Sequence, residues 1–337
     1  MINFIQFITT RAFLAIITLL AVSFIIFALM ELVPANCAER YLAFKNTQGS
    51  NITIEDIEAE ERRLGLDRPF LVRWSTWVSN IVIKRDFGNS CILRVRINDL
   101  MKDKFFLSLG ICFTALLLAY LIAVPVGIIS ATTKFRSLDN ALKLISYLGL
   151  AIPNFLLALI IILFSVVFFG DTMTGLFTPE YVNAPWSFDK FKNFLSRAWL
   201  PIFILGWSAT AFALQTVRAL ISDEYEKLYV VAAKARGISG MTLLWKYPAR
   251  HSLGPIINSL GFDLNRIFNE LPIVALILML TESGALLVES LARNNDQQLA
   301  GAIIILLTGT IITLNFLTDV LLAVIDPRIR KGVMGGS

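Results

Sequence analysis

The sequence predicts an all-α membrane protein in which six helices cross the bilayer, and two observations carry that prediction. Of the 337 residues, 56% are hydrophobic and only 16% are charged, whereas soluble domains carry about a quarter charged residues. The apolar residues also gather in six long runs, each able to supply the roughly 20 residues that a spanning helix needs. These runs cover about 12–33, 105–131, 141–169, 199–221, 255–281 and 299–325.

Each run is expected to form one span. The first is too long for the apolar core of a signal peptide, and no cleavage site of small residues follows it, so we expect it to be retained. The second and third contain Pro125 and Pro153, which predict helix kinks that a bundle tolerates. Before the fourth span, residues 188–194 are expected to form a separate short helix on the surface.

Basic residues predict the orientation of the spans, because cytoplasmic loops carry an excess of Lys and Arg. One set of short loops offers only Lys190, Lys192, Arg197 and Arg293. The 34–102 segment is too long to determine orientation. Both termini are therefore expected in the cytoplasm, on the side that carries Arg11, Lys134, Arg136, Lys143, Lys227, Lys234, Arg236, Lys246, Arg250, Arg328, Arg330 and Lys331.

The external 34–102 segment is expected to contain one helix with clear end signals. Residues 54–64 are acidic at their start and end in Arg62 and Arg63, which suits the helix dipole. Thr53 is placed to cap the first turn.

The loop between the fourth and fifth spans, at about 223–250, has the features of a docking element. Ala232 and Ala233 give a helix face without bulk, and Gly237 is expected to end that helix because glycine readily adopts the left-handed conformation. A second short helix is expected over 241–245. Two short helices joined at a glycine on the cytoplasmic side favour contact with a soluble partner.

This loop resembles the EAA loop of permease subunits of bacterial ATP-binding-cassette (ABC) importers, in the peptide-permease branch. The branch pattern is Tyr-Val, two variable residues, then Ala-x-Ala-x-Gly, and Val231 stands where the eponymous Glu would be. The matching residues are Tyr229, Val230, Ala233, Ala235 and Gly237.

Further motifs extend the resemblance from the first span to residue 330. The Leu-Gly-Leu-Asp-Arg-Pro of 64–69 and the Asp-Phe-Gly-x-Ser of 86–90 are similar to the external region of the family, and 326–330 is similar to its C-terminal signature. Two stretches depart from the family. Pro-Ala-Asn-Cys at 34–37 replaces Pro-Gly-Asp-Pro, and 275–284 keeps only the last glycine of a longer motif, which leaves the solute more in doubt than the mechanism.

The resemblance implies one permease half of an importer for peptides or a similar small solute in the bacterial inner membrane. The implied partners are a second homologous permease subunit, two ABC ATPase subunits, a periplasmic solute-binding protein and the lipid bilayer, with no nucleic acid. The sequence has no phosphate-binding G-x-x-x-x-G-K-[ST] loop. ATP and Mg are therefore expected in the partner subunits, and this chain is expected to be no enzyme and to hold no cofactor or metal. The expected ATPase-docking residues are Tyr229, Ala232, Ala233, Arg236 and Gly237.

The expected organisation has four parts. Residues 1–33 are the cytoplasmic N-terminus and first span, and 34–102 are a periplasmic segment. Residues 103–330 form a five-helix permease core with the docking loop, and 331–337 form a cytoplasmic tail.

Two cysteines, Cys37 and Cys91, fall in the segment assigned to the periplasm, which keeps thiols oxidised. We expect them to form a disulfide. The alternative, two unpaired thiols too far apart to bond, stays open. Cys112 lies inside the second span and is expected to act as a small apolar residue.

The fifth span carries a polar stripe. Asp263, Arg266 and Glu270 are spaced i, i+3 and i+7 and share one helix face, with Asn269 near its edge. A charge inside a spanning helix costs at least roughly 2.5 kcal/mol, so such residues face a bundle interior or a wet cavity. The pairs Asp263–Arg266 and Arg266–Glu270 could staple this helix to a neighbour, or the stripe could line the solute path together with Asn315.

In the last span, Asp319 is expected to pair with a basic residue near the cytoplasmic boundary. Three other functions fit the sequence less well. An ion-coupled secondary transporter would show inverted repeats, and no internal repeat is visible. An intramembrane enzyme lacks a catalytic constellation, and a purely structural subunit would leave the ordered motifs without a role. The solute itself stays open among dipeptides, oligopeptides, nickel complexes, glycans and opines.

Overall fold

The computed structural model describes residues 2–49, 52–170, 173–182, 184–280, 282–293 and 295–325. Helices dominate these residues, and the only extended pairing among them is an isolated bridge between Asn89 and Arg96. The predicted C-terminal signature at 326–330 and the tail at 331–337 lie outside the described residues. The all-α class is thus confirmed for the part of the chain that the structure describes.

Four helices are long and apolar enough to cross a membrane: α1 (Ile2–Leu32), α5 (Ile97–Thr132), α9 (Phe188–Tyr225) and α14 (Gln297–Ile325). A fifth crossing is possible if α6 (Arg136–Ala151) and α7 (Asn154–Phe169) together make one broken span. The predicted fifth span lies in α12 (Pro248–Ile277), whose charged stripe lowers its hydropathy. Length and composition therefore yield four or five of the six predicted spans in the described chain.

One proline separates two helices, whereas two others lie inside continuous helices. At Pro153 the helix axis turns by 95° between α6 and α7, and Ile152 before it is extended with φ −91° and ψ 114°, as the ring of a following proline demands. Pro125 and Pro201 stay inside α5 and α9. The prediction of a separate helix at 188–194 is wrong, because these residues form the first turns of an unbroken α9.

By contacts the chain divides into two compact units. The first unit comprises residues 1–11, 109–280 and 314–337, and the second unit comprises 12–108 and 281–313. Three of the boundaries fall within α1, α5 and α14, and the fourth, after residue 280, falls between α12 and α13.

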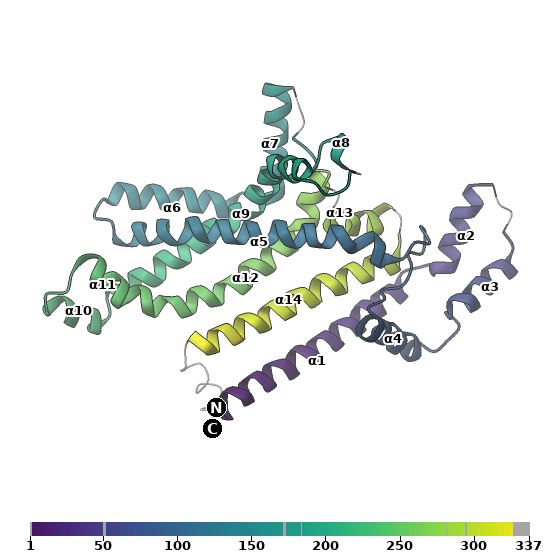
Figure 1. Cartoon of the computed structure of the whole chain (residues 1–337), viewed down its shortest axis with the longest axis horizontal. Helices are drawn as coiled ribbons and strands as arrows, with labels where there is room; N and C mark the ends of the chain where they lie inside the picture. The colour runs from purple at the N-terminus through teal and green to yellow at the C-terminus, as the bar shows by residue number, and fades with distance from the viewer. Residues whose placement is uncertain are drawn as a thin grey trace. The chain divides into compact units, whose positions relative to one another are not determined.

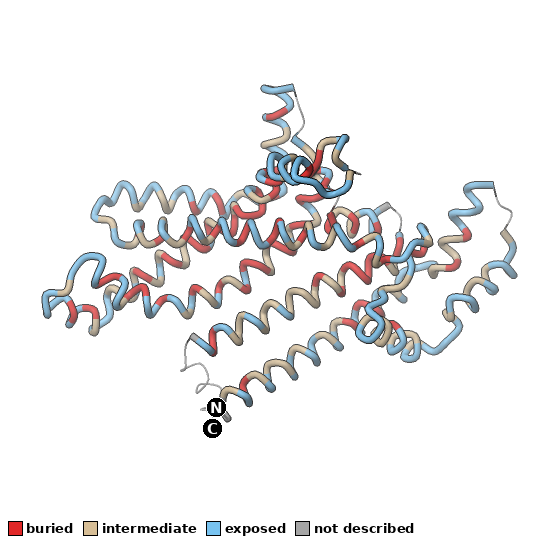
Figure 2. The backbone as a smooth tube through the Cα atoms, in the orientation of Figure 1, coloured by how far each residue is buried: buried red, intermediate tan, exposed pale blue. Residues whose placement is uncertain are grey.

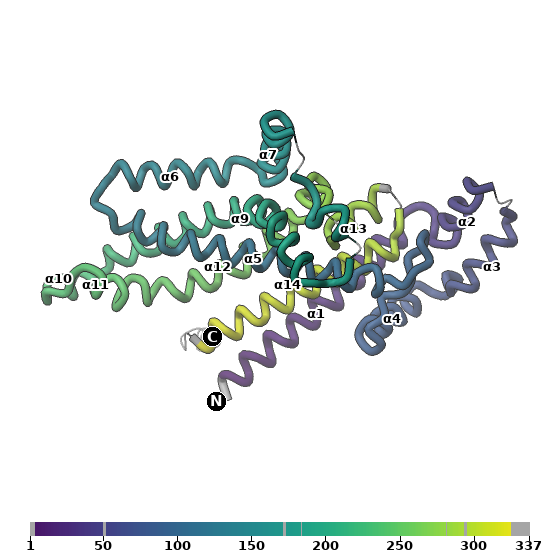
Figure 3. The backbone as a smooth tube through the Cα atoms, turned by 45° about the horizontal axis from the view of Figure 1, so that its top comes forward, coloured from purple at the N-terminus to yellow at the C-terminus, as the bar shows by residue number. Residues whose placement is uncertain are grey.

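In the first unit, α5, α6, α9 and α12 lie side by side (Figures 1 and 3). Buried residues concentrate along α9 and α12, which form its core (Figure 2). The α5–α6 turn and the short helices α10 (Leu228–Ala235) and α11 (Gly240–Lys246) lie at one end of this bundle, and α7 and α8 (Pro179–Val182) lie at the other (Figure 1). Both basic connections of the first unit are therefore at the same end, as the orientation prediction requires.

The second unit holds the segment after the first span: α2 (Cys37–Thr47), α3 (Ile54–Leu64), α4 (Phe70–Ser79) and the π-helical turn η1 (Asn80–Lys84). It also holds α13 (Ser283–Val288) and the π-helical turn η2 (Glu289–Arg293). Its apolar core joins Ile26, Phe27, Trp77 and Ile305.

The predicted helix at 54–64 is confirmed, together with its end signals. The Thr53 hydroxyl accepts a hydrogen bond from the Asp56 amide, and the Asp56 carboxylate accepts one from the Thr53 amide. At the other end Gly65 adopts the left-handed conformation with φ 69°. A side-chain cap thus sets the start of α3, and the backbone conformation of glycine sets its end.

Candidate functional site

The first candidate site is the α10–α11 loop, and Gly237 forms its turn. Gly237 has φ 82°. Its amide donates to the Lys234 carbonyl at 2.9 Å, and the Ile238 amide donates to the Ala233 carbonyl at 3.2 Å. This pair of bonds is the Schellman motif that ends helices at glycine. A Cβ atom built on Gly237 meets nothing within 4 Å, so the backbone conformation alone requires glycine here.

The loop has its own small core. Val230, Ala233 and Leu243 are buried there, with partly buried side chains from Tyr225, Tyr229, Ile238 and Tyr247 packed around them. Ala233 therefore lies inside the loop, whereas its neighbour Ala232 is exposed. Of the two predicted docking alanines, only Ala232 offers its surface to another protein.

Tyr229 connects the loop to α9 and α12. Its hydroxyl donates to the Glu224 carboxylate, and its ring lies 5.0 Å from that of His251 and 6.3 Å from that of Tyr247, between centroids. Burial and then the adjacent Glu224 raise the pKa of Tyr229 above its ordinary value, so the hydroxyl stays a hydrogen-bond donor. Tyr229 is thus a structural member of the loop, while Arg236 is exposed.

The outer surface of the loop is apolar and basic. Leu228 is 86% exposed, Met241 64%, Trp245 57% and Val231 50%. Lys234, Arg236 and Lys246 are exposed on the same two helices and their connection. Exposed apolar side chains grouped beside charges are typical of a protein interaction surface.

The inner side of the loop is fixed to the bundle. Leu244 of α11 is buried in a cluster with Val217 and Ile221 of α9 and Ile256 of α12, and Ile128 of α5 packs against that cluster. A displacement of α11 therefore reaches three helices of the first unit directly.

A polar cluster missed by the sequence reasoning ties the same ends together. The Asp139 carboxylate of α6 accepts from Arg218 Nε at 2.8 Å and Nη2 at 3.0 Å. It also accepts from Ser130 at 2.6 Å and pairs with Lys143 at 2.6 Å. Nothing local in the sequence marks Asp139, because its partners come from α5 and α9 as well as α6.

The second candidate site is the polar face of α12. Asp263 is 1% exposed, and its carboxylate accepts from the Tyr120 hydroxyl at 2.7 Å and from Arg266 Nη2 at 3.0 Å. The same Arg266 nitrogen donates to the Ser208 carbonyl at 3.0 Å. Tyr120 also hydrogen-bonds Ser259 at 2.8 Å. The predicted Asp263–Arg266 pair forms, and it links α12 to α5 and α9.

Glu270 has a different partner from the one expected. Its carboxylate accepts from the side-chain amide of Asn154, which also donates to the Ser208 hydroxyl at 3.1 Å. The expected Arg266–Glu270 ion pair is thus replaced by a contact with α7. Asn154 directly follows Pro153, the proline of the predicted kink, and it is buried at 3% exposure.

The other two predicted path residues lie apart from this cluster. Asn269 is exposed and Asn315 is half-buried. Asn315 faces the backbone of α12 at Gly261, where an added Cβ would lie 3.0 Å from Asn315 Oδ1. Asp319 pairs with Arg11 at 3.2 Å, which confirms the expected basic partner.

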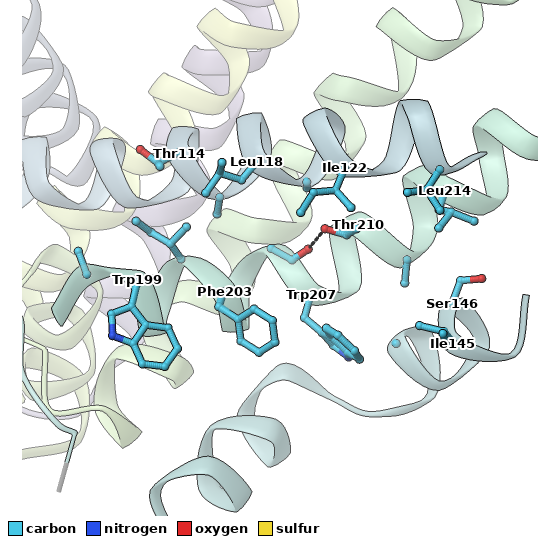
Figure 4. Close-up of a pocket in the computed structure, with 18 of the residues that line it drawn as sticks. Thr114, Leu118, Ile122, Ile145, Ser146, Trp199, Phe203, Trp207, Thr210 and Leu214 are labelled. Carbon is cyan, nitrogen blue, oxygen red and sulfur yellow. Dashed lines mark hydrogen bonds between the residues drawn. The ribbon is translucent and has the colours of Figure 1, made fainter. Parts of the chain in front are cut away.

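A cavity of about 610 Å³ lies between α5, α6 and α9 in the first unit (Figure 4). Its lining is almost wholly apolar and includes Trp199, Phe203 and Trp207 of α9, with Leu118 and Ile122 of α5 opposite (Figure 4). None of the predicted path residues lines it.

In the second unit, Cys37 and Cys91 form a disulfide with their Cα atoms 5.3 Å apart. The turn that carries Cys91 is held by Asp296, which is 1% exposed. Its carboxylate accepts from the Ser90 hydroxyl, from the Cys91 amide at 3.1 Å and from the Leu299 amide at 3.0 Å. One buried carboxylate thus caps α14 and fixes the Asp-Phe-Gly-x-Ser motif.

Glu282 has a structural role within 275–284, the stretch that departs from the family's motif. This side chain is fully buried and caps α13, accepting from the amides of Gly284 at 2.7 Å and Ala285 at 2.9 Å. Ser108 of α5 also donates to it.

Comparison with known proteins decides the family. Residues 123–331 match the model of the binding-protein-dependent transport system inner membrane component, and residues 4–94 match its N-terminal companion. The chain belongs to this family.

Several relatives of this chain are permeases, and each match covers most of both proteins. The chain is 27% identical to the oligopeptide transport system permease protein AppB of Bacillus subtilis (strain 168), covering 96% of this chain and 99% of the relative. It is 27% identical to the glutathione transport system permease protein GsiC of Escherichia coli (strain K12), covering 93% and 95%. It is 26% identical to the putrescine export system permease protein SapB of the same strain, covering 77% and 86%.

Among solved structures, this chain is similar to a chain of the inward-facing MetNI methionine ABC transporter, with a TM-score of 0.53 and 16% identity. The match covers 67% of this chain and 96% of that one, and it shows the fold alone. As a member of this family of binding-protein-dependent transport systems, the chain is a permease subunit and a multi-pass protein of the bacterial inner membrane.

Proposed function

We propose that this permease forms half of the translocation path of an ATP-driven importer for peptides or a similar small solute. In this proposal a second permease completes the path and a periplasmic binding protein delivers the solute. Two separate ATPase subunits drive the transport through the α10–α11 loop. α12 serves as the fifth of six spanning helices in this scheme, with both termini in the cytoplasm.

The observation that carries the proposal is the two-sided structure of the α10–α11 loop. Its outer side exposes Leu228, Met241 and Trp245, while Leu244 on its inner side packs into the ends of α5, α9 and α12. Such an element can accept a soluble partner on one side and pass its displacement to the spanning helices on the other.

We also propose different roles for the residues on the polar face of α12. The burial of Asp263 and its bonds to Tyr120 and Arg266 favour a staple between helices. Contact with solute then falls to Asn269, which is exposed, and to the half-buried Glu270 and Asn315.

The coupling proposal is tested on the complex of this chain with its partner permease and ATPase subunits. Gly237→Val places a β-branched residue at φ 82°, which costs on the order of 1–2 kcal/mol or more and distorts the loop. We expect stimulation of ATP hydrolysis by the loaded binding protein to fall about tenfold or more, which corresponds to roughly 1.4 kcal/mol of lost coupling.

Gly170→Val is the matched control. Gly170 ends α7 with φ 67°, and a Cβ there also meets nothing within 4 Å, so the backbone cost is similar at the opposite end of the first unit. Equal loss in both variants, or unaltered stimulation in Gly237→Val, would contradict the proposal. Failure of the ATPase subunits to copurify with the wild-type chain would contradict it as well.

The two alanines separate docking from folding of the loop. Ala232→Leu is expected to leave the loop resistant to protease while reducing ATPase stimulation, because Ala232 is exposed. Ala233→Leu is expected to open the loop to protease, because Ala233 has no room at 0% exposure and overpacking a core costs about 1–3 kcal/mol. The reverse pattern would show that Ala233 faces the partner.

A further inference from the structure

The second unit contains a polar cavity of about 610 Å³ beside the disulfide. It lies between α2, α3, the turn at 89–94 and the start of α14. This volume is within the range of small-molecule sites. None of the residues assigned above to the solute path lines this cavity.

The charged side chains that line the cavity are both arginines, Arg63 and Arg94. Glu60 lies behind them and pairs with each, through Arg63 Nε at 2.7 Å and through Arg94 Nη2. These three groups together carry one net positive charge. Arg94 Nε is buried and forms no hydrogen bond with the described residues, so this guanidinium is not saturated by its protein partners.

Neutral hydrogen-bonding groups complete the lining. Asn89 and Gln298 line the cavity, and no hydrogen bond joins either side-chain amide to another residue that the structure describes. Tyr41 lies under Arg94, whose Cζ is 3.7 Å from the ring centroid. The lining thus offers two guanidinium groups, one of them stacked on the Tyr41 ring, and two side-chain amides.

The cavity is held in shape before any ligand arrives. The disulfide joins α2 to the turn at Cys91, and Asp296 holds Ser90 and Cys91 from the other side. The bridge between Asn89 and Arg96 closes the turn, in which Arg94 adopts φ 58°. Preorganisation of this kind lowers the entropic cost of binding.

We propose that this cavity binds a carboxylate group at Arg94 and Arg63, with the adjoining chain of the ligand on Asn89 and Gln298. A planar guanidinium matches a carboxylate in two parallel hydrogen bonds. The ligand class is a peptide-like molecule with a free carboxylate, at its C-terminus or on an acidic side chain. This inference rests on the proposed function, the transport of peptides or similar solutes. The binding test uses this chain alone, so a negative result would leave the coupling proposal untouched.

The test is a thermophoresis titration of the full chain in lipid nanodiscs. The probes are N-acetyl-trialanine with a free carboxylate, the same peptide as its amide, and N-acetyl-Ala-Glu-Ala-amide. We expect the free acid to bind and the amide to bind about tenfold or more weakly, because hydrogen bonds to charged groups are the strong ones. Binding of the third peptide as tightly as the acid identifies an acidic side chain as an equally good ligand.

Two variants locate the site. Arg94→Gln is expected to weaken the free acid about tenfold or more, whereas Arg96→Gln is the matched control. Arg96 is exposed and pairs with Asp99 at 3.0 Å outside the cavity, so its loss should leave binding unchanged.

Gln298→Glu keeps the test decisive if Arg94→Gln disturbs the fold. Gln298 is the second residue of α14, where a negative charge favours the helix, yet a carboxylate there repels the ligand. The intact Cys37–Cys91 bond, checked by mass spectrometry, reports folding in each variant. Equal binding of acid and amide, absence of saturable binding by the acid, or full binding by a folded Gln298→Glu would each overturn the proposal.

Discussion

Glu60 is the residue that joins α3 to the turn at 89–94. The hydrogen bonds from Arg63 are the largest cause that lowers the pKa of Glu60 below its ordinary value of 4.5, with Arg94 acting in the same direction and burial opposing. A lowered pKa in the folded state means that the ionised carboxylate stabilises the fold. That stabilisation is complete above the ordinary pKa and is lost as pH falls through the lowered one.

We therefore predict an acid-dependent difference between the wild-type chain and Glu60→Gln. Hydrogen exchange of α3 should be slower in the wild type near neutral pH. The difference should begin to shrink below the ordinary pKa of 4.5 and disappear below the lowered pKa, where folded Glu60 takes up a proton. Glu55, exposed on the same helix, supplies the control Glu55→Gln. A difference that stayed constant from neutral to acid pH would show that charge on Glu60 plays no part.

Single residues also mark the limit of what the sequence could predict. Gly237 and Thr53 were predictable, because each acts on the backbone within a few positions of itself. The sequence could not predict that Ala232 is exposed and Ala233 buried. Both are small residues on the same short helix, and only the positions of Val230 and Leu243 in the fold distinguish them.

At the level of elements, α12 is held by contacts from other helices. Tyr120 is 143 positions from Asp263, and Asn154 is 116 positions from Glu270. The i, i+3, i+7 spacing could show that the charges share a face, but no local signal could name partners so far away. For the same reason the Arg266–Glu270 pair was expected and the Asn154–Glu270 contact was not.

The two carboxylates of α12 should respond differently to neutralisation. Asp263→Asn removes the ion-pair partner of the half-buried Arg266 and the charged acceptor of Tyr120, so we expect poor assembly. Glu270→Gln keeps an acceptor for Asn154, so we expect normal assembly with altered preference between cationic and anionic solute analogues.

The measurement for that pair is the yield of assembled complex followed by uptake of both analogues. If Glu270→Gln assembles and transports both with unchanged preference, Glu270 is only a contact for α7. If Asp263→Asn assembles as well as the wild type, the Asp263–Arg266 ion pair is not needed for assembly.

At the level of the whole molecule, the two basic connections of the first unit share one end of the bundle, away from α7 and α8 (Figure 1). We predict that Lys234→Cys, on α10, is labelled by an impermeant thiol reagent only from the cytoplasmic side. Phe188→Cys, at the first residue of α9 and 80% exposed, should be labelled only from outside. Labelling of both from one side would overturn the proposed orientation.

The second unit has a further consequence for the order of events during synthesis. Cys37 and Cys91 are 54 positions apart, but Asp296 lies 205 positions after Cys91. At about 5–20 residues per second, the ribosome adds Asp296 roughly 10–40 s after Cys91. The covalent bond can therefore close while the carboxylate that will hold the same turn has not yet been made. In the proposed orientation the oxidants of the periplasm form this disulfide, and the bond holds Cys37 and Cys91 together during that interval without any part of the later chain.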